Sequence, residues 1–323
     1  MNILVTGGAG YIGSHTCKQL KKQGYNPITY DNLSRGHKEF VKWGPLVVGD
    51  ILDTKKVTET LKEYNIQAVL HFAAFAYVGE SVEKPELYYR NNVHGSLSLF
   101  EGMIQANVKK LVFSSTCATY GMPEKVPLTE DLLQNPINPY GQSKLMVEKI
   151  LKDFGTAYNF KSVCLRYFNA AGADVESEIG EWHEPETHLI PLAIDGVLKN
   201  KTMKIFGTDY PTPDGTCLRD YIHVSDLAQA HVLALKYLDT AEKNFDYFNL
   251  GNEKAYSVKE ILTAVEKVSG KKVPAETYSR RPGDPSLLVS DSTKAKNILG
   301  WKPEVTNIND IIKTAYDWHM KSI

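Results

Sequence analysis

A tyrosine and a lysine stand four positions apart in the segment NPYGQSK, as Tyr140 and Lys144. Two residues at that spacing lie on one face of a helix, one turn apart. Because a free phenol has a pKa of about 10, work as a base near neutral pH requires a decrease of about three units, or about 4 kcal/mol. A neighbouring ammonium supplies part of that stabilisation, and the positive ring of an oxidised nicotinamide supplies more. The pair therefore predicts proton transfer beside a nicotinamide, whereas alone it would also fit an exposed helix.

A glycine-rich loop near the N-terminus supplies the nicotinamide context. The run TGGAGYIGSH carries Gly7, Gly10 and Gly13 between an expected strand and an expected helix. Glycine permits the tight turn and a close approach to a pyrophosphate, and the helix N-terminus offers free N–H groups. Asp31 ends the next expected strand, where a carboxylate holds the ribose hydroxyls of NAD and repels a 2′-phosphate. These residues predict NAD, although Arg35 in the following stretch could argue for NADP.

The elements that must position these residues alternate between apolar strands and helices. Apolar strands that alternate with helices of this length indicate a parallel sheet covered on both faces. The fold class is therefore α/β, a Rossmann-type doubly wound parallel sheet. We expect strands at 2–7, 27–31, 45–50, 67–73, 109–116 and 162–168, and helices at 11–23, 53–64, 89–106 and 139–155.

The alternation of strands and helices ends near Gly172. From there to about Arg219 the chain is rich in proline, glycine, glutamate and histidine, and 245–251 (FDYFNLG) indicates one more strand able to rejoin the sheet. We expect an NAD-binding domain at 1–170 with a returning segment near 222–251. Residues 171–323 then form mainly a smaller C-terminal α/β substrate-binding domain.

Composition argues against several other classes of protein. The 37 basic and 38 acidic residues leave a formal charge of −1, without the basic excess of a nucleic-acid-binding protein. The most apolar stretch, AVLHFAAFAYVG, is too short to cross a membrane. The four cysteines form no CxxC pair, and no histidine cluster completes a zinc site, so we expect no metal. The chain enters a strand at once, which leaves no signal peptide and predicts a cytoplasmic enzyme or binding protein.

Nine ordered motifs connect these features to a known family. They are TGGAGYIGSHT, DNLSRG, HFAA…VGESVEKP, NNVHG, FSSTCATYG, NPYGQSK, LRYFNAAGA, PTPDGTCLRDYIHV and RRPGD. Over nearly the whole chain the sequence resembles the extended short-chain dehydrogenase/reductase family, and within it the UDP-hexose 4-epimerases. The resemblance implies a homodimer in which the helices near 89–106 and 139–155 pair across a two-fold axis.

The resemblance also implies the reaction. UDP-glucose and UDP-galactose would be interconverted by NAD-dependent oxidation at C4, rotation of the 4-keto intermediate and re-reduction. Thr116 would hydrogen-bond the sugar 4-hydroxyl, Tyr140 would take its proton, and Lys144 would hold the nicotinamide ribose and lower the tyrosine pKa. Related dehydratases carry an acidic pair directly after the threonine, but this chain has Cys117 and Ala118.

Two other functions remain open at this point. One is another NAD-dependent nucleotide-sugar dehydratase or reductase. The other is a catalytically silent dinucleotide-binding sensor, against which the intact trio of Thr116, Tyr140 and Lys144 argues.

Further residues are expected at the cofactor. Asp50 follows the third strand and suits the adenine edge, although a helix N-cap is the alternative. The remaining expected cofactor contacts are Tyr11, Ile12, Asn32, Ser34, Gly36, Ile51, Phe72, Ala73, Ala74, Asn91, Ser114 and Phe168.

The resemblance places a second set of residues at the nucleotide sugar. Guanidinium groups suit a diphosphate through charge-assisted bonds, which fits Arg219 and Arg281. Asp284 would bind the uridine ribose, and Phe206 would pack near the uracil unless it is a core residue. His188 could instead be structural. The remaining members of this set are Asn169, Leu189, Lys204, Tyr221 and Leu288.

Two positions depart from the best-known pattern of the family. Many epimerases have a lysine where this chain has Ala76. Family members with a tyrosine at the position of Leu288 exclude N-acetylated sugars. Leucine leaves room, so we expect UDP-glucose and UDP-galactose as substrates and their N-acetyl analogues as further candidates.

Overall fold

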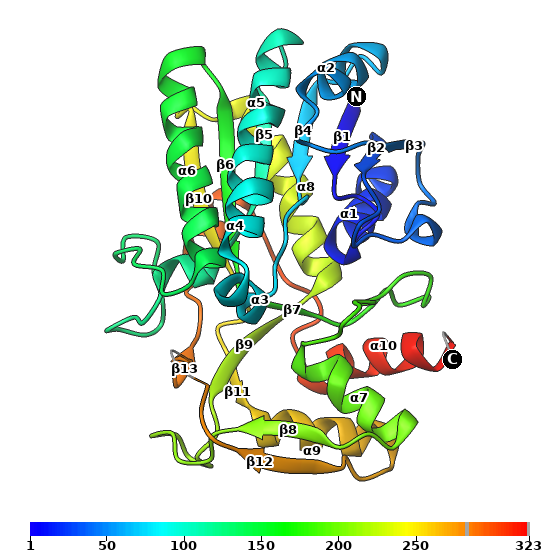
Figure 1. The fold of residues 1–323 in the computed structure, drawn as a ribbon, viewed down its shortest axis with the longest axis vertical. Helices are drawn as coiled ribbons and strands as arrows, with labels where there is room; N and C mark the ends of the chain where they lie inside the picture. The colour runs from blue at the N-terminus through cyan, green and yellow to red at the C-terminus, as the bar shows by residue number, and fades with distance from the viewer. Residues whose placement is uncertain (282–283, 322–323) are drawn as a thin grey trace.

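The computed structural model describes residues 1–281 and 284–321, and its larger part is built on a seven-stranded parallel sheet (Figure 1). The strand order is β10-β6-β5-β4-β1-β2-β3. The order therefore reverses between β1 and β4, which makes the sheet doubly wound as predicted. Ligands of such sheets bind beyond the carboxyl ends of the strands at this reversal. The strands are β1 Asn2–Thr6, β2 Asn26–Asp31, β3 Leu46–Val48, β4 Ala68–His71, β5 Lys110–Thr116, β6 Lys161–Tyr167 and β10 Phe245–Leu250.

Helices cover both faces of this sheet. Side chains alternate between the two faces of a strand, so Ile3 and Val5 of β1 pack in one core and Leu4 in the other. Burial on both faces explains why these strands are continuous apolar runs. Helices α1 (Tyr11–Lys22) and α8 (Val224–Thr240) cover the first face. The second face is covered by α2 (Thr54–Glu63), α5 (Gly95–Gln105) and α6 (Pro139–Tyr158).

One strand and one helix of the larger part come from late in the sequence. Strand β10 pairs parallel with β6, with Phe245 opposite Ser162. Helix α8 contributes Leu227, Leu235 and Leu238 to the core of the first face. The expectation that 245–251 rejoins the sheet is therefore confirmed.

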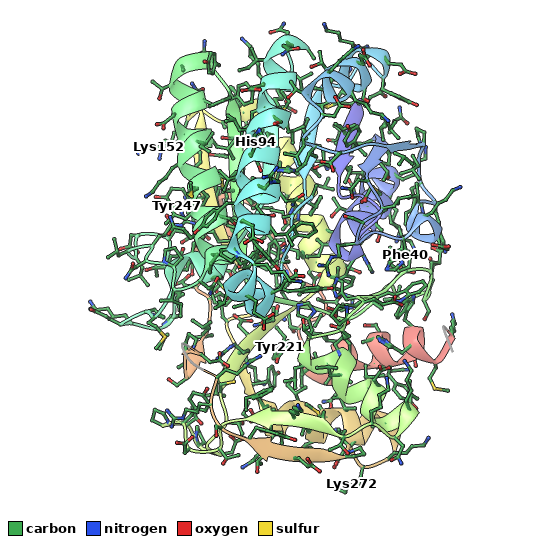
Figure 2. The ribbon with its side chains drawn as sticks, in the orientation of Figure 1. Phe40, His94, Lys152, Tyr221, Tyr247 and Lys272 are labelled. Atoms are coloured by element: carbon green, nitrogen blue, oxygen red, sulfur yellow. The ribbon has the colours of Figure 1, made fainter. Side chains whose placement is uncertain are left out.

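The smaller part lies beyond the carboxyl ends of the main strands, and Tyr221 of β9 lies between the two parts (Figures 1 and 2). It contains a four-stranded sheet and a two-stranded sheet around a separate core that includes Ile194, Ile261 and Ile312. Its elements are β7 Asn169–Ala171, β8 Met203–Phe206, β9 Leu218–His223, β11 Ala255–Ser257, β12 Ala275–Tyr278, β13 Leu287–Leu288, α7 Leu189–Lys199, α9 Val258–Ser269 and α10 Ile308–Lys321.

The helix expected at 89–106 is not one regular α-helix. It starts as the π-helical turn η2 (Tyr89–His94) and continues as α5. The wider turn carries the buried Asn92, whose amide bonds the backbone of Phe75 and the hydroxyl of Ser143 on α6. The other short helical segments are η1 Lys38–Phe40, α3 Val78–Glu83, α4 Pro85–Tyr88, η3 Cys117–Tyr120 and η4 Ala295–Leu299. Within the described ranges, no helix combines the length and the apolar character that a membrane crossing needs.

Candidate active site

The start of α6 places Tyr140 at the end of the main sheet. Asn138 is the N-cap and accepts a hydrogen bond from the Gly141 N–H at 2.8 Å, and Pro139 is the first helical residue. Both features favour a helix start at this point. Tyr140 is 8% exposed and Lys144 is 3% exposed, so the pair faces inward. An exposed surface pair is excluded.

The end of β5 meets this face of α6. The Lys144 ammonium donates to the Ser114 carbonyl at 2.8 Å and lies 4.8 Å from the Phe113 ring centroid. Thr116 ends the strand, and its hydroxyl interacts with Tyr140 and accepts from the Ala118 N–H. The structure therefore brings together the three residues predicted to be catalytic.

The pKa values in the protein alone favour a protonated phenol. Burial and the neighbouring Tyr167 raise the pKa of Tyr140 above its ordinary value, and the bond with Thr116 offsets only part of this increase. Burial lowers the pKa of Lys144 to about 7. A lower pKa for the phenol therefore requires positive charge that arrives with a ligand.

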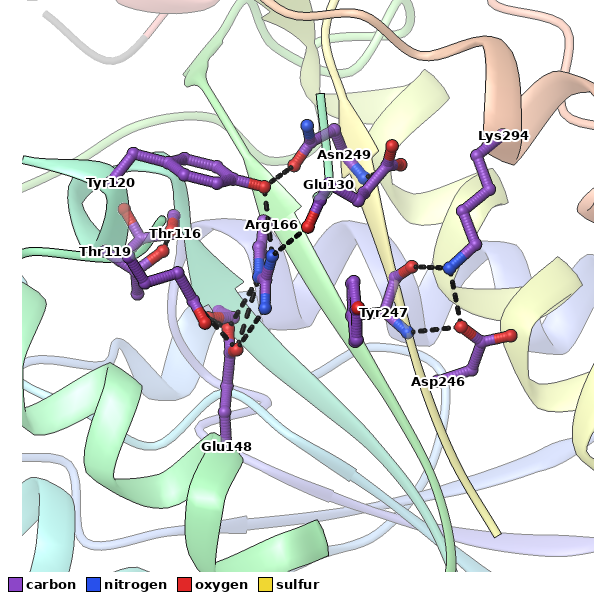
Figure 3. Close-up of polar contacts among 12 residues, drawn as sticks. Thr116, Thr119, Tyr120, Glu130, Glu148, Arg166, Asp246, Tyr247, Asn249 and Lys294 are labelled. Carbon is purple, nitrogen blue, oxygen red and sulfur yellow. Dashed lines mark hydrogen bonds and ion pairs between the residues drawn. The ribbon is translucent and has the colours of Figure 1, made fainter. Parts of the chain in front are cut away.

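A buried ion pair sets the position of α6 (Figure 3). Glu148 lies one turn beyond Lys144, and Arg166 of β6 donates to it from Nη2 at 2.7 Å and from Nε at 3.1 Å. Both side chains are 3% exposed, and Ser115 of β5 also donates to Glu148. This pair was not predicted from the sequence. Its signals were an acid four residues after Lys144 and a lone arginine inside an apolar strand.

The turn after Thr116 belongs to the same network (Figure 3). Arg166 Nη1 donates to the Tyr120 hydroxyl at 3.0 Å, and Tyr120 donates to the Asn249 side chain on β10 at 2.8 Å. The strand end that carries Thr116 is thus tied to the late strand of the sheet.

The glycine loop has the geometry of a dinucleotide cradle. Gly7 has φ of +71°, and a Cβ there would lie 2.6 Å from the Ala73 nitrogen. A Cβ at Gly13 would overlap the Gly7 carbonyl oxygen. Gly10 is the N-cap of α1 and has no side chain to bond the first-turn amides. Those N–H groups have no carbonyl partner inside the helix and favour an anion.

Asp31 faces the glycine loop from the end of β2. Its carboxylate accepts from the Ala9 N–H at 3.0 Å and the Leu33 N–H at 2.9 Å. Burial raises the pKa of Asp31, and these two bonds act in the opposite direction. Arg35 pairs with Glu80 at 3.0 Å, so it is already engaged with a carboxylate. The carboxylate of Asp31 and the already paired guanidinium of Arg35 together fit NAD better than NADP.

Asp50 lies beside the residues that follow Asp31. Asn32 donates to its carboxylate at 3.0 Å, and the Leu52 N–H donates at 2.9 Å. The alternative reading of Asp50 as a helix N-cap is wrong, because Asp53 caps α2 by accepting from the Lys56 N–H.

The other expected cofactor residues fall into two groups. Most of the apolar ones pack at the sheet ends, and several polar ones bond neighbouring protein groups. Tyr11 donates to the Gly172 carbonyl at 2.6 Å, and the Ser114 hydroxyl pairs with Tyr167 at 2.7 Å. Five apolar residues of this set pack in the hydrophobic cores: Ile12, Ile51, Phe72, Ala73 and Phe168. Placed in turns or on short helices are Ser34, Gly36, Ala74 and Asn91.

Four residues expected at the nucleotide sugar converge in the smaller part. Arg219 and Arg281 both form ion pairs with Asp284, the second at 2.9 Å. The Arg281 guanidinium lies 5.0 Å from the Phe206 ring centroid. Phe206 is half-buried and is not part of the local core, which includes its neighbour Ile205. This position favours a stacking surface over a core residue.

Leu288 connects this group with the turn that follows Thr116. It stands opposite Arg219 in the β13–β9 register and packs against Tyr120 and Phe168. Farther along β9, Asn169 of β7 stands opposite Tyr221.

The remaining expected residues lie at either end of the smaller part. His188 is the N-cap of α7, directly before Leu189. Burial lowers the pKa of His188, but Glu181 and Glu186 raise it to about 10 overall. Lys204 is exposed on β8, 4.9 Å from the Tyr278 ring centroid.

Comparison with known proteins agrees with this site. The model of the NAD dependent epimerase/dehydratase family matches residues 3–251. A UDP-glucose 4-epimerase of Rhizobium leguminosarum bv. trifolii is 52% identical over 321 residues, 99% of this chain and 98% of that protein. The crystal structure of UDP-glucose 4-epimerase from Brucella ovis in complex with NAD is 50% identical, with a TM-score of 0.95 over 98% of this chain and 97% of that one.

A third similar protein is the UDP-glucose 4-epimerase from Bifidobacterium longum, solved in complex with NAD⁺ and UDP. It is 39% identical, with a TM-score of 0.94 over 99% of this chain and 98% of that one. With a family model across more than half of its length and relatives this similar along nearly all of it, the chain belongs to the NAD dependent epimerase/dehydratase family.

Proposed function

We propose that this protein is a UDP-glucose 4-epimerase that interconverts UDP-glucose and UDP-galactose with bound NAD. The observation that carries the proposal is the convergence of Tyr140, Thr116 and Lys144 at the end of β5, two strands along the sheet from the β1 end that carries the glycine loop. The name of the Rhizobium relative and the NAD in the Brucella ovis structure support the same reaction.

The residues of the larger part would hold the dinucleotide. The first turn of α1, after Gly10, would bind the pyrophosphate, Asp31 the ribose hydroxyls and Asp50 the adenine edge. Lys144 would bind the nicotinamide ribose, and the Ser114 carbonyl already orients its ammonium. The bound NAD supplies a reversible hydride acceptor for C4 of the sugar.

Two hydroxyl groups would handle the proton. Tyr140 Oη would accept the proton of the sugar 4-hydroxyl and later return it, and Thr116 would orient that hydroxyl. The burial of Tyr140 excludes bulk water from the exchange. Because Cys117 and Ala118 offer no acid for a leaving hydroxyl, the site favours epimerisation over the dehydratase alternative.

Two cationic groups would hold the diphosphate. Arg219 and Arg281 both form ion pairs with the carboxylate of Asp284. Each guanidinium can replace part of this pairing with bonds to phosphate oxygens. The UDP in the Bifidobacterium longum structure fits this nucleotide-binding role. Leu288, packed between this group and Phe168, would set the room for the sugar 2-substituent.

Each of the two parts of the structure would bind one ligand. Residues 1–170 with the returning segment 222–251 would bind NAD, and most of 171–323 would bind the nucleotide sugar. A homodimer in which the helices near 89–106 and 139–155 pair across a two-fold axis completes the proposal. Light scattering should then give twice the chain mass of 36.2 kDa.

The function is tested by incubating the purified protein with UDP-galactose and no added cofactor, and following the sugar by proton NMR. We expect conversion to UDP-glucose up to an equilibrium that is the same from either sugar. Loss of the C6 hydroxyl would instead support a dehydratase, and an unchanged spectrum would refute the proposal.

A further inference from the structure

A cluster of two histidines and two glutamates lies outside the proposed proton-transfer chemistry. Glu181, His183, Glu186 and His188 stand within eight positions of the chain, directly before α7. One potential ligand atom from each lies within 4.8 Å of all the others. In contrast to the expectation of no metal from the sequence, we propose that these four residues form a binding site for a transition-metal ion, with Zn²⁺ as the best match. The proposal does not depend on the epimerase reaction.

The distances within the cluster match the edges of a coordination tetrahedron. His188 Nδ1 lies 2.8 Å from Glu181 Oε1 and 3.1 Å from Glu186 Oε1. His183 Nδ1 lies 3.3 Å from Glu181 Oε1 and 3.6 Å from Glu186 Oε2. Ligand bonds of about 2.1 Å place tetrahedral donors about 3.4 Å apart. Four of the six edges are therefore close to this value, and a rotation of the Glu186 carboxylate would let one of its oxygens serve both histidines.

The orientation of His183 favours a shared ion over simple pairing. Its Nδ1 atom is buried, yet among the described residues it has no hydrogen bond of ordinary geometry. Buried polar atoms in native proteins nearly always have a partner. A cation shared with the Glu181 and Glu186 oxygens, which lie 3.3 and 3.6 Å from this nitrogen, would give it a partner.

The chemistry of the donors selects the kind of ion. Two imidazoles and two carboxylates suit Zn²⁺ and neighbouring transition metals, whereas Ca²⁺ and Mg²⁺ prefer oxygen ligands alone. With four protein ligands the coordination is closed, as in structural zinc sites. A structural role therefore follows, without activation of water.

A second acidic cluster in the molecule provides a contrast. Asp174, Glu176 and Glu178 also lie close together, but the Lys18 ammonium stands among them at 2.8, 2.6 and 2.6 Å. That cluster already holds a permanent cation of the chain itself, whereas a metal ion at Glu181 would take the place of the protons on His183 and His188. Within the described residues, the ion pairs of the cluster at Glu181 involve no lysine or arginine.

An ion at this position would tie three segments together. Trp182, inside the cluster segment, stacks on His37 with ring centroids 4.0 Å apart, next to the loop expected to bind the adenosine. The ring of His183 lies 6.4 Å from Tyr11 of α1 and 5.7 Å from Tyr77. Since His188 begins α7, the ion would hold the start of that helix against the cofactor side.

The test measures metal content rather than turnover. The purified protein is treated with a chelator, exposed to Zn²⁺, passed through a desalting column and analysed by mass spectrometry of the metals. We expect about one zinc per chain. Substitution with Co²⁺ should give the absorption of a tetrahedral site without a thiolate charge-transfer band, which separates this site from the free cysteines.

Two ligand variants and two controls complete the experiment. His183→Gln and Glu186→Gln should each weaken Zn²⁺ binding at least about tenfold. Glu178→Gln in the lysine-filled cluster and His94→Gln at the exposed end of η2 should bind zinc like the parent. If one ligand variant does not fold, the other and the parent still decide the question. A parent protein with no zinc above buffer level, ligand variants that retain it, or a thiolate band would overturn the proposal.

Discussion

Tyr140 is a buried phenol whose surroundings, in the protein alone, keep its proton in place. Burial and Tyr167 raise its pKa, and the nearby Lys144 has its own pKa lowered to about 7. Tyr140 can therefore act as a base only when a bound ligand brings positive charge close to it. A resting enzyme with a protonated phenol avoids an uncompensated buried charge, which is costly in a low-dielectric site.

The buried Lys144 predicts a pH-dependent stability of the nucleotide-free protein. Its pKa is about 7 when folded and 10.5 as a free side chain. The unfolded chain therefore binds more protons between those values, so the contribution of Lys144 to the free energy of unfolding rises from pH 7 to pH 10. Urea unfolding at a series of pH values should show this rise, and Lys144→Met should remove it. A parallel pH dependence of parent and variant would contradict the assignment.

Leu288 predicts the choice of sugar at the residue scale. Leu288→Tyr should abolish activity on UDP-N-acetylhexoses and leave UDP-glucose turnover nearly unchanged, because the larger ring fills the room beside the sugar 2-position. Leu287→Tyr is the matched control, since neighbouring strand residues point to opposite faces. Kinetics on both substrate classes test this prediction. An equal loss of activity on plain and N-acetylated sugars would contradict the proposed role of Leu288 in substrate choice.

At the scale of elements, the site depends on how α6 is fixed against β5 and β6. The Glu148–Arg166 pair is buried, and Ser115 shares the same carboxylate. Tyr140 and Lys144 lie on the preceding turns of the same helix. A shift of α6 would therefore move both away from Thr116.

Glu148→Gln should destabilise the protein by about 3–5 kcal/mol, because Arg166 would remain as a buried charge without its partner. We also expect a lower kcat with a smaller change in KM, since Glu148 positions the helix without touching substrate. Asp153→Asn, exposed on the same helix, is the control. The double variant Glu148→Leu with Arg166→Met should recover most of the lost stability in urea unfolding. A single variant as stable as the parent would refute this positioning role.

The elements of the main sheet were predictable because their strands are buried on both faces. Such strands appear as continuous apolar runs, as in β1, β4 and β5. The two-residue strand β13 carries no such pattern, and the π-helical turn at Tyr89–His94 shares its residue types with an ordinary helix. Tyr140, Lys144 and the glycine loop were found because their spacing lies within one element. The contacts between elements, such as Arg166 with Glu148, are not encoded in any local spacing.

At the scale of the whole molecule, two elements of the larger part, α8 and β10, come after β7, α7, β8 and β9 of the smaller part in the sequence. Helix α8 buries Leu227, Leu235 and Leu238 against the sheet, and β10 covers the edge of β6. The two parts are therefore interwoven in the sequence. The carboxyl ends of the main strands face the smaller part (Figure 1). Strand β9 of that part carries Arg219, which forms an ion pair with Asp284.

This arrangement predicts that residues 1–170 do not fold by themselves. Without α8 one face of the sheet would expose a large apolar surface, and without β10 the β6 edge would be unpaired. The fragment should show no cooperative thermal transition by circular dichroism and should not retain NAD, whereas the full chain should do both. A fragment that melts cooperatively and binds NAD would contradict this account.

The proton transfer assigned to Tyr140 is tested most directly by the turnover of Tyr140→Phe on UDP-galactose, with bound NAD measured in the same sample. Tyr158→Phe, on the exposed end of the same helix, is the matched control. The account predicts that Tyr140→Phe loses turnover by about two to four orders of magnitude while NAD remains bound, and that the control retains turnover. A Tyr140→Phe protein that epimerises at the parent rate would contradict the central claim.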